Sequence, residues 1–195
     1  MSGVRAGSVK RRTGETEISV SLKLDGEGRY LVDTGLPFFD HMLQLFCKHA
    51  SYDLELTAHG DLQVDGHHTV EDAGICLGLA LKDALGDKQG INRYGHAFVP
   101  MDEALALVAV DLSGRGFLAF DAGLPAQQLG TFETELVQEF FRALALSGQL
   151  TLHIRLLAGV NTHHIIEAIF KGLARAMKDA TAYVGGGIPS TKGTL

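Results

Sequence analysis

Two segments of the sequence combine histidine and glutamate at a spacing that suits a metal site. The pattern His-His-x-x-Glu occurs at residues 67–71 and again at 163–167, an offset of 163 − 67 = 96 residues. In an α-helix, residues four apart share a face, so the first histidine and the glutamate of each motif can bind one cation together. Imidazole and carboxylate ligands without thiolate favour Mn, Fe, Zn, Co or Ni. The ligand candidates are His67, His68, Glu71, His163, His164 and Glu167.

The second histidine of each motif points away from that pair, because successive helical side chains are about 100° apart. Two repeats packed about a pseudo-twofold axis could exchange these spare histidines, His68 and His164. The first motif would then take His164, and the second motif would take His68. This exchange predicts two related sites, each with two imidazoles and one carboxylate.

A fourth ligand of each site could come from upstream. His41 lies 26 residues before His67, and Glu139 lies 24 residues before His163, so the two occupy equivalent places before the motifs. By this symmetry, each would complete one site. The spacing does not decide which residue belongs to which site, nor whether the ligands come from one subunit.

Two other regions carry groups that suit a phosphate. Residues 185–193 combine glycines with Ser190 and Lys192, although they lack the spacing of a Walker A loop. Arg93 and Arg115 fall in expected turns, where a guanidinium could bind a phosphate. The alternatives are an unstructured tail and solvated arginines.

The elements that must position these groups repeat as the motifs do. Residues 67–84 and 163–180 are identical at eight positions in one register, which predicts a duplicated half. We expect a single catalytic domain, 1–195, made of two homologous halves at roughly 1–90 and 91–195. Apolar periodicity predicts strands, a helix, a strand and a long helix in each half. The fold class that follows is α+β, a two-layer α/β sandwich built from the duplicated half.

The expected boundaries come from alternation, helical periodicity and turn residues. The expected strands are 17–24, 29–33, 52–58, 97–101, 104–112, 117–121 and 150–157. The expected helices are one that begins at Pro37 and three that span 67–85, 134–146 and 163–183.

The composition is that of a globular chain. Of 195 residues, 46% are hydrophobic and the net charge is −6, with lysine and arginine dispersed, which argues against nucleic-acid binding. The longest apolar run, 104–110, is far shorter than the ~20 residues of a membrane span, and the first residues lack a signal-like apolar core. Cys47 and Cys76 lie in apolar stretches, which is typical of reduced, buried cysteines in a cytoplasmic protein.

Five stretches of the chain match a known pattern together. They are 38–43 (FFDHML), 66–72 (GHHTVED), 111–115 (DLSGR), 161–167 (NTHHIIE) and 189–193 (PSTKG). With them, the chain resembles the imidazoleglycerol-phosphate dehydratase family of histidine biosynthesis, from about residue 11 to residue 195. The resemblance implies conversion of D-erythro-imidazole-glycerol phosphate to imidazole-acetol phosphate and water.

The resemblance also implies two Mn(II) per subunit and assigns their ligands. One metal would bind His41, His68, His163 and Glu167, and the other would bind His67, Glu71, Glu139 and His164. Some relatives carry His where this chain has Glu139, so the affinity of that site could differ. The implied substrate contacts are Glu15, His49, Arg93, Arg115, Lys171, Ser190 and Lys192. The implied assembly is a homo-oligomer, a 24-mer built from trimers, with active sites between subunits.

The chemistry of this dehydration sets the roles. The hydrogen to be removed lies on a carbon next to an imidazole rather than a carbonyl, so no enolate can form. An imidazolate held between two metals could act as a reservoir of electrons, and loss of hydroxide would then give a diazafulvene-like intermediate. A carboxylate must carry the proton, and Glu15 is the candidate because the paired glutamates act as ligands. The catalytic candidates are Glu15, His67, Glu71, His163 and Glu167.

Two other functions fit part of the pattern. A dinuclear metallohydrolase acting on a phosphorylated small molecule would share the metals and the arginines. A metal-storage or structural shell would share only the His/Glu clusters. A keto product rather than released phosphate would exclude the hydrolase, and competitive inhibition by a triazole phosphonate would argue against storage.

Overall fold

The elements of the chain follow one another twice in nearly the same order. The computed structural model describes residues 4–195. The first half contains β1 (Ala6–Arg12), β2 (Thr16–Lys23), β3 (Tyr30–Asp33), α1 (Pro37–Ala50), β4 (Asp53–Gly60) and α2 (His67–Leu85). The second half contains β5 (Tyr94–Met101), β6 (Ala104–Asp111), β7 (Phe117–Asp121), α3 (Leu136–Ser147), β10 (Thr151–Ala158) and α4 (Thr162–Thr181). A small hairpin, β8 (Gln128–Leu129) and β9 (Phe132–Glu133), is inserted before α3.

Each half forms a mixed four-stranded sheet. The strand orders are β1-β2-β4-β3 and β5-β6-β10-β7. In both sheets the last two strands of this order pair in parallel, and the other neighbours pair antiparallel. The repeated order of parallel and antiparallel pairs shows that the two halves have the same topology.

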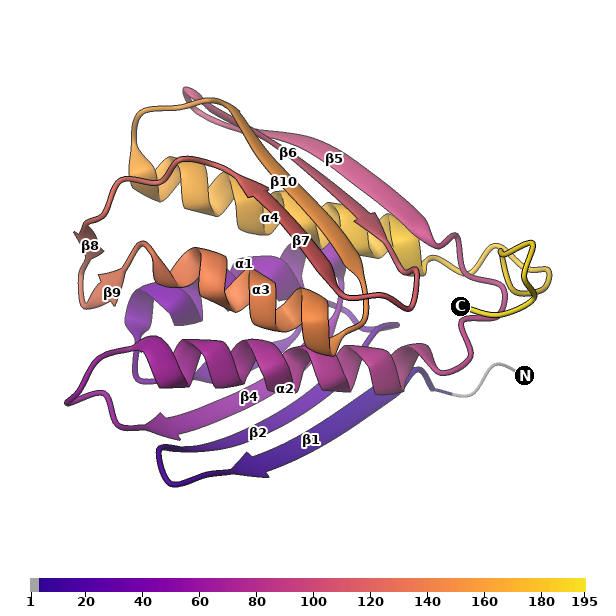
Figure 1. Ribbon diagram of the computed structural model, residues 1–195, viewed down its shortest axis with the longest axis horizontal. Coiled ribbons are helices and arrows are strands. Elements are labelled where there is room, and N and C mark those ends of the chain that lie inside the picture. Colours follow the sequence, from indigo (N-terminus) through magenta and orange to yellow (C-terminus); the bar gives the residue numbers. More distant parts are fainter. Residues whose placement is uncertain (1–3) are drawn as a thin grey trace.

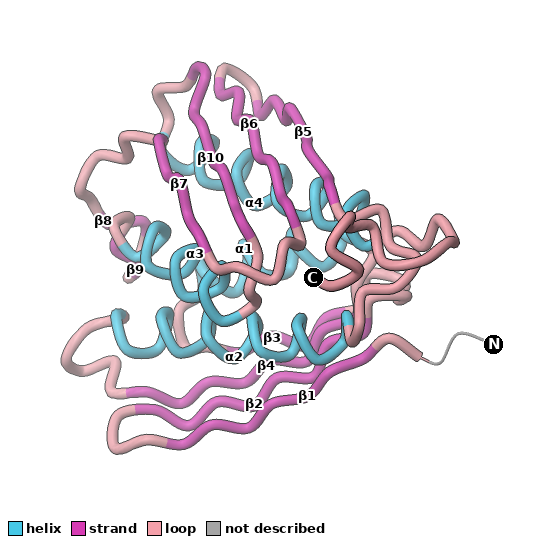
Figure 2. Tube along the Cα trace, turned by 45° about the vertical axis from the view of Figure 1, so that its right-hand side comes forward, coloured by secondary structure: helices cyan, strands magenta, loops and turns pink. Residues whose placement is uncertain are grey.

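The four helices lie between the two sheets (Figure 1). Helix α2 packs on β1 and β2, and α4 packs on β5 and β6. The halves meet through their helices, α2 against α3 and α1 against α4. Figure 2 shows the resulting order of layers, a sheet, the helices and the second sheet. The expected α+β class is therefore confirmed, with each half a two-layer unit and the two units stacked helix to helix.

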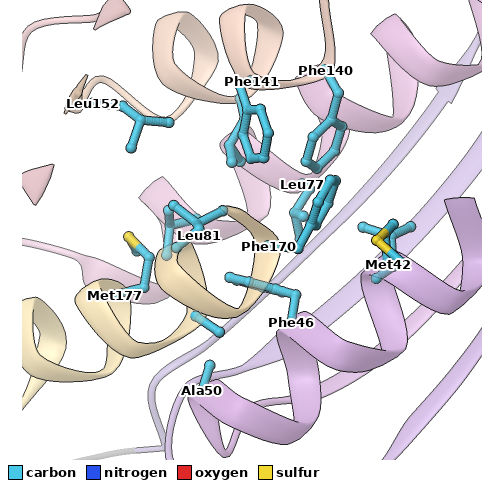
Figure 3. Packing of buried hydrophobic residues seen from close by; sticks show 14 of the residues in the cluster. Met42, Phe46, Ala50, Leu77, Leu81, Phe140, Phe141, Leu152, Phe170 and Met177 are labelled. Atoms are coloured by element: carbon cyan, nitrogen blue, oxygen red, sulfur yellow. The ribbon is translucent and has the colours of Figure 1, made fainter. Parts of the chain in front are cut away.

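Large apolar side chains from all four helices fill the space where the halves meet (Figure 3). Phe140 and Phe170 stack with their ring centroids 5.5 Å apart, and Phe141 contacts Phe170 at 4.9 Å. These rings, with Met42 of α1 and Leu77 of α2, are at most 1% exposed. Burying such a side chain contributes about 1.5–3 kcal/mol. This packing therefore fixes how the two halves sit against each other.

Strand β1 is not predicted from the sequence. Its residues, AGSVKRR, include one fully buried position, Gly7, and no alternation of large apolar side chains. The periodicity that reveals half-buried strands is therefore missing. The segment becomes a strand because it pairs with β2 along its whole length. Smaller differences are that β5 begins at Tyr94 rather than residue 97, and that α4 ends at Thr181 rather than residue 183.

Two further expectations concern the cysteines and the membrane. Cys47 and Cys76 are free and buried, as the sequence predicts. Burial raises the pKa of the Cys47 thiol to about 12 and that of the Cys76 thiol to about 11, so both stay protonated at neutral pH. Within residues 4–195, none of the helices combines the length and apolar character that crossing a membrane requires.

Two glycines let the long helices lie directly on the sheets. A Cβ atom at Gly7 would lie 2.1 Å from the carbonyl oxygen of Ala80, and one at Gly95 would lie 1.9 Å from that of Ala176. Ala80 and Ala176 are equivalent in the repeat, since 176 − 80 = 96. Only a residue without a side chain allows the helix backbone to approach this closely.

Gly95→Ala is therefore expected to destabilise the fold by about 1–3 kcal/mol or more, because the added methyl group forces α4 off the sheet. The measurement is the midpoint of urea denaturation. Gly14→Ala is the matched control, because a Cβ there meets nothing within 4 Å. An unchanged midpoint for Gly95→Ala would contradict the close packing of strand and helix.

Candidate active site

Three of the predicted metal ligands gather in one chain. The Nε2 atoms of His163 and His41 lie 3.2 Å and 3.6 Å from Oε2 of Glu167. Ligand atoms of all three residues lie within 4.8 Å of one another, and no other group of three or more such side chains in residues 4–195 does so. His41 comes from the first turns of α1, and the other two come from the start of α4. The expected partnership of a helical pair with an upstream histidine is present in this cluster.

Glu167 is buried but ionised. It is 7% exposed, and Nζ of Lys171 donates a hydrogen bond of 2.6 Å to its Oε1. Burial alone would raise the pKa of this carboxyl group, but Lys171 and the neighbouring His163 and His41 hold it below its usual value. Oε2 faces the two imidazoles, so the carboxylate presents a negative oxygen where two nitrogen donors converge.

The helix start fixes where the second motif points. Asn161 caps α4, and its side-chain oxygen accepts hydrogen bonds from the backbone N–H groups of His163 and His164 at 2.9 Å and 3.3 Å. Such a cap stabilises a helix by about 1 kcal/mol. At the start of α2, Asp65 accepts a hydrogen bond of 2.8 Å from the backbone N–H of His67. Both motifs therefore begin at the start of a helix, which a side chain caps in α4 but not in α2, whose N-cap is Gly66.

The first motif is not assembled into an equivalent cluster. His67 and Glu71 lie half-buried on α2. The carboxylate of Glu139, on α3, is paired with the guanidinium of Arg142 three residues later. The structure thus brings the upstream residue His41 to its expected partners. It leaves Glu139 in an ion pair with Arg142 of the same helix.

The spare histidines stand apart from the cluster. Nδ1 of His68 lies 3.0 Å from Asp61, and its Nε2 lies 3.8 Å from Glu15. Nδ1 of His164 lies 2.8 Å from Glu103. Within one chain, neither imidazole joins the His41, His163 and Glu167 cluster. An exchange of these histidines would therefore have to take place between chains.

The predicted anion groups form a second site. Arg93, Arg115, Ser190 and Lys192 line a cavity of about 560 Å³. Nε and Nη2 of Arg93 donate hydrogen bonds to both carboxylate oxygens of Asp111, and its Nη1 donates one of 2.8 Å to the carbonyl of Pro189. Arg93 therefore fastens the C-terminal segment to β6, and the segment is packed rather than unstructured.

Arg115 and Lys192 supply the available charge of this cavity. Both side chains are exposed, and within residues 4–195 neither forms an ion pair. Arg115 follows Gly114, which has φ +76° and so lets the chain turn at this position. A guanidinium and an ammonium facing one cavity suit a phosphate group.

The His/Glu cluster and the anion cavity lie at opposite ends of the fold. Helices α2 and α4 run the length of the molecule, with the motifs at their first turns and the C-terminal segment beyond the other end (Figure 1). The 20 residues of α4 span about 30 Å at 1.5 Å per residue. A small substrate cannot bridge this distance, so one chain cannot bring both sites to one molecule.

His49 and Lys171 lie on the two helices that carry the cluster. His49 is in the last turn of α1. Burial, followed by the positive charges of Lys171 and Arg175, lowers the pKa of His49. His49 therefore stays neutral at neutral pH, while Lys171 is bound to Glu167.

Comparison with known proteins decides the family. A family model described as imidazoleglycerol-phosphate dehydratase matches residues 34–177. An imidazoleglycerol-phosphate dehydratase from Pelotomaculum thermopropionicum is 68% identical over 192 residues, and the alignment covers 98% of each chain. The chain belongs to the imidazoleglycerol-phosphate dehydratase family. The members of this family are hydro-lyases of histidine biosynthesis, as the sequence resemblance implies.

Other family members agree in sequence and in fold. The protein of that name from Desulforudis audaxviator is 62% identical, with 98% of each chain covered. The crystal structure of the Staphylococcus aureus N315 enzyme superposes with a TM-score of 0.83 at 43% identity, over 91% of this chain and 99% of that one. The Pyrococcus furiosus enzyme in complex with (S)-C348 superposes with a TM-score of 0.82 at 38% identity, over 96% and 100%.

Sequence reasoning missed the carboxylates beside the spare histidines. Asp61 and Glu103 belong to no motif; Asp61 precedes a turn, and Glu103 lies in the turn between β5 and β6. One signal could have found Glu103. The first two strands of each half form a hairpin, and an equivalent backbone hydrogen bond follows each hairpin. The N–H of Leu24 donates to the carbonyl of Arg5, and the N–H of Leu112 donates to the carbonyl of Arg93. The two hairpins therefore repeat with an offset of 112 − 24 = 88 residues. The same offset makes Glu103 the repeat equivalent of Glu15, since 15 + 88 = 103.

The histidines are expected to titrate in a defined order in the metal-free protein. The hydrogen bonds that the carboxylates of Asp61 and Glu103 accept raise the pKa of His68 and of His164 above 6.5, and burial lowers the pKa of His49 below it. Each raised pKa adds stability to the folded metal-free protein below pH 6.5, and this stability is lost as the pH rises through the raised value. NMR titration of the imidazole shifts measures the order. A His164 that titrates below His49 would contradict it.

Proposed function

We propose that this chain is a dehydratase that converts D-erythro-imidazole-glycerol phosphate to imidazole-acetol phosphate and water in histidine biosynthesis. One observation carries the proposal. A chain 68% identical to an enzyme of that name also holds a His/Glu cluster and a separate cationic cavity of the size of a phosphorylated small molecule. The buried thiols agree with a reducing, cytoplasmic setting for this activity.

The donor set supports two Mn(II) ions per subunit. The assembled cluster offers two imidazole nitrogens and one carboxylate oxygen and no thiolate, which fits Mn(II) and related metals. One ion would bind His41, His68, His163 and Glu167, and the other would bind His67, Glu71, Glu139 and His164. Glu139 must release Arg142 before it can bind. When bound, the two cations would supply the Lewis acidity that stabilises the deprotonated imidazole ring, whose electrons can then expel hydroxide.

Residues outside the proposed metal sites would bind the phosphate, move the proton and keep Glu167 ionised. Arg115, Lys192 and Ser190 would hold the phosphate in the cavity, and Arg93 would keep the C-terminal segment in place along it. Glu15 would move the proton, because it is an exposed carboxylate only 3.8 Å from Nε2 of His68 and is itself outside the ligand sets. Lys171 would keep Glu167 ionised.

The distribution of these groups supports an active site shared between subunits. Neither spare histidine reaches the cluster of its own chain, and the anion cavity lies at the far end of the helices. A neighbouring copy would supply both the missing imidazole and the phosphate site. The proposed assembly is a homo-oligomer, and the 24-mer built from trimers that the resemblance implies stays a prediction.

The two sheets differ in a way that also supports assembly. On the outer face of the second sheet, Phe98 pairs across from Leu107, and Phe98 and Phe117 are 61% and 54% exposed. On the outer face of the first sheet, Ser8 pairs across from Ser21. An apolar sheet face on one side of the molecule suits contact with another copy.

The competing hydrolase would use the same groups to release phosphate. Purified, Mn-loaded protein incubated with the substrate separates the two functions. The dehydratase forms a keto product and leaves the phosphate ester intact. Release of inorganic phosphate without a keto product would favour the hydrolase and contradict the proposal.

Glu15→Gln is expected to lower turnover by about 100-fold or more, because the amide cannot carry the proton. Mn content and particle mass should stay the same, since Glu15 is outside the ligand sets. Glu17→Gln is the matched control, an exposed glutamate of the same hairpin whose one ion pair is with Arg12 at 3.8 Å. Near-normal turnover of Glu15→Gln would remove Glu15 from the mechanism.

A shared active site predicts complementation between two inactive chains. His163→Ala removes a metal ligand and Arg115→Ala removes a phosphate ligand, so each homo-oligomer should be inactive. Co-expressed together, they should recover activity, because some sites then combine the intact cluster of one chain with the intact cavity of the other. The measurement is keto-product formation by an assembly whose mixed composition is verified by native mass spectrometry.

The control pairs His163→Ala with a chain that carries both substitutions. No intact cluster can form in that mixture, so it should stay inactive. A verified mixed assembly of the two single variants that has no activity would show that cluster and cavity must belong to one chain.

A further inference from the structure

Each spare histidine has a carboxylate on the same ring nitrogen. Nδ1 of His68 lies 3.0 Å and 3.2 Å from the two oxygens of Asp61, in the segment between β4 and α2. Nδ1 of His164 lies 2.8 Å from Oε2 of Glu103, in the turn between β5 and β6. The two carboxylates come from different kinds of segment, yet they meet the same atom of equivalent histidines.

A carboxylate on Nδ1 determines which nitrogen can bind a metal. An ionised carboxylate only accepts hydrogen bonds, so Nδ1 must carry the proton that is shared. In the neutral imidazole, Nε2 then has the free lone pair, and the ring cannot turn without losing the bond. We propose that Asp61 and Glu103 are positioning residues, which fix the tautomer and direction of the two spare histidines so that each presents Nε2 to a metal bound by another copy. The inference rests on the proposed function.

Glu103 is the more firmly held of the two. Its Oε1 accepts hydrogen bonds from the backbone N–H groups of Val160 and Asn161, at 3.2 Å and 2.7 Å, which leaves Oε2 for His164. Asn161 in turn caps α4. The β5–β6 turn, the start of α4 and the imidazole are thus joined through one side chain. For Asp61, both oxygens face His68, and no other hydrogen bond to its side chain occurs within residues 4–195.

The duplication shows how this role differs between the halves. Glu103 is the repeat counterpart of Glu15 in the leading hairpin, with an offset of 88 residues. Glu15 lies on the Nε2 side of His68, at 3.8 Å, whereas Glu103 lies on the Nδ1 side of His164, whose Nε2 side faces the neighbouring Asp102 at 3.7 Å. Equivalent positions of the two hairpins therefore place a carboxylate near Nε2 of His68 but near Nδ1 of His164. In the first half, Asp61 takes the place at Nδ1 that Glu15 does not occupy.

A purely structural role for Glu103 would be to accept the two backbone N–H groups. Glu103→Gln separates the two roles. The amide oxygen can keep the bonds to Val160 and Asn161, which places the NH₂ group against Nδ1 of His164. The NH₂ group can only donate, so the proton of the imidazole must move to Nε2 and block the metal-binding nitrogen. The fold is retained while the tautomer is inverted.

Asp61→Leu is the second variant. The aspartate anchors no backbone group, so its loss should leave the fold intact. It removes the acceptor, so His68 should become a mixture of tautomers. Glu55→Gln is the matched control, because Glu55 is an exposed residue of β4 and, within residues 4–195, forms no hydrogen bond or ion pair with a histidine.

The experiment combines two measurements on metal-stripped full-length protein. Nitrogen-15 NMR of the imidazoles reports the tautomer, and titration with Mn(II) reports the affinity and number of ions per chain. We expect the Nδ1–H tautomer at both spare histidines of the unchanged protein and of Glu55→Gln. We expect His164 of Glu103→Gln to show the Nε2–H tautomer, with one of the two ions bound about 10–100-fold more weakly. His68 of Asp61→Leu should show both tautomers, with weakened binding of the other ion.

The outcomes separate this inference from the proposed function. If the unchanged protein binds two ions, and Glu103→Gln and Asp61→Leu keep the Nδ1–H tautomer and full affinity, the positioning role is wrong and the metal sites stand. If the unchanged protein binds no Mn(II), the proposed metal sites fail, and the tautomers still decide the positioning role. Urea denaturation verifies folding, and if Glu103→Gln unfolds, Asp61→Leu alone decides the inference.

Discussion

The site depends on a limit of helix geometry. In a His-His-x-x-Glu motif, the first histidine and the glutamate share a face, and the second histidine points about 100° away. One motif can therefore supply only two ligands to a cation. The structure shows this for the second motif, where His163 and Glu167 converge with His41, while His164 is turned to Glu103. Everything else in the proposed site follows from the need to bring a further imidazole from elsewhere.

The duplicated fold places the two motifs at equivalent positions of its two halves. Two sheets hold four helices between them, and both motifs start at the same end of that layer (Figure 1). The close approach of helix to strand at Gly7 and Gly95 fixes each long helix on its sheet. The phenylalanine cluster of Phe140 and Phe170 joins the halves. These contacts hold both motifs at one end of the helix layer, and the anion cavity lies at the opposite end.

Much of the fold could be predicted from the sequence because the signals were strong. The helix at 67–85 and the strand at 117–121 have the bounds expected from periodicity and from Gly86. The pairing of His41 with the second motif required knowing a family pattern, because spacing alone allowed either site. Strand β1 could not be found, since its one fully buried residue is a glycine that makes room for a helix rather than an apolar side chain that fills a core.

The supporting carboxylates could not be predicted for a different reason. Asp61 and Glu103 act through single hydrogen bonds to a ring nitrogen, and such contacts leave no periodic trace in a sequence. The pairing of Glu139 with Arg142 could have been predicted, because the two residues are three apart on one helix, whereas the metal assignment of Glu139 came from the repeat. Local patterns therefore indicated the candidate ligands, and the structure shows which side chains contact them.

The central claim is that each metal is bound by residues of more than one chain. The most direct measurement locates the metal by anomalous scattering in crystals of the Mn-loaded assembly. The account predicts a Mn(II) at the cluster of His41, His163 and Glu167, with its remaining imidazole, from the position of His68, supplied by a neighbouring copy. Ions bound by ligands of one chain alone, or found away from this cluster, would contradict the account.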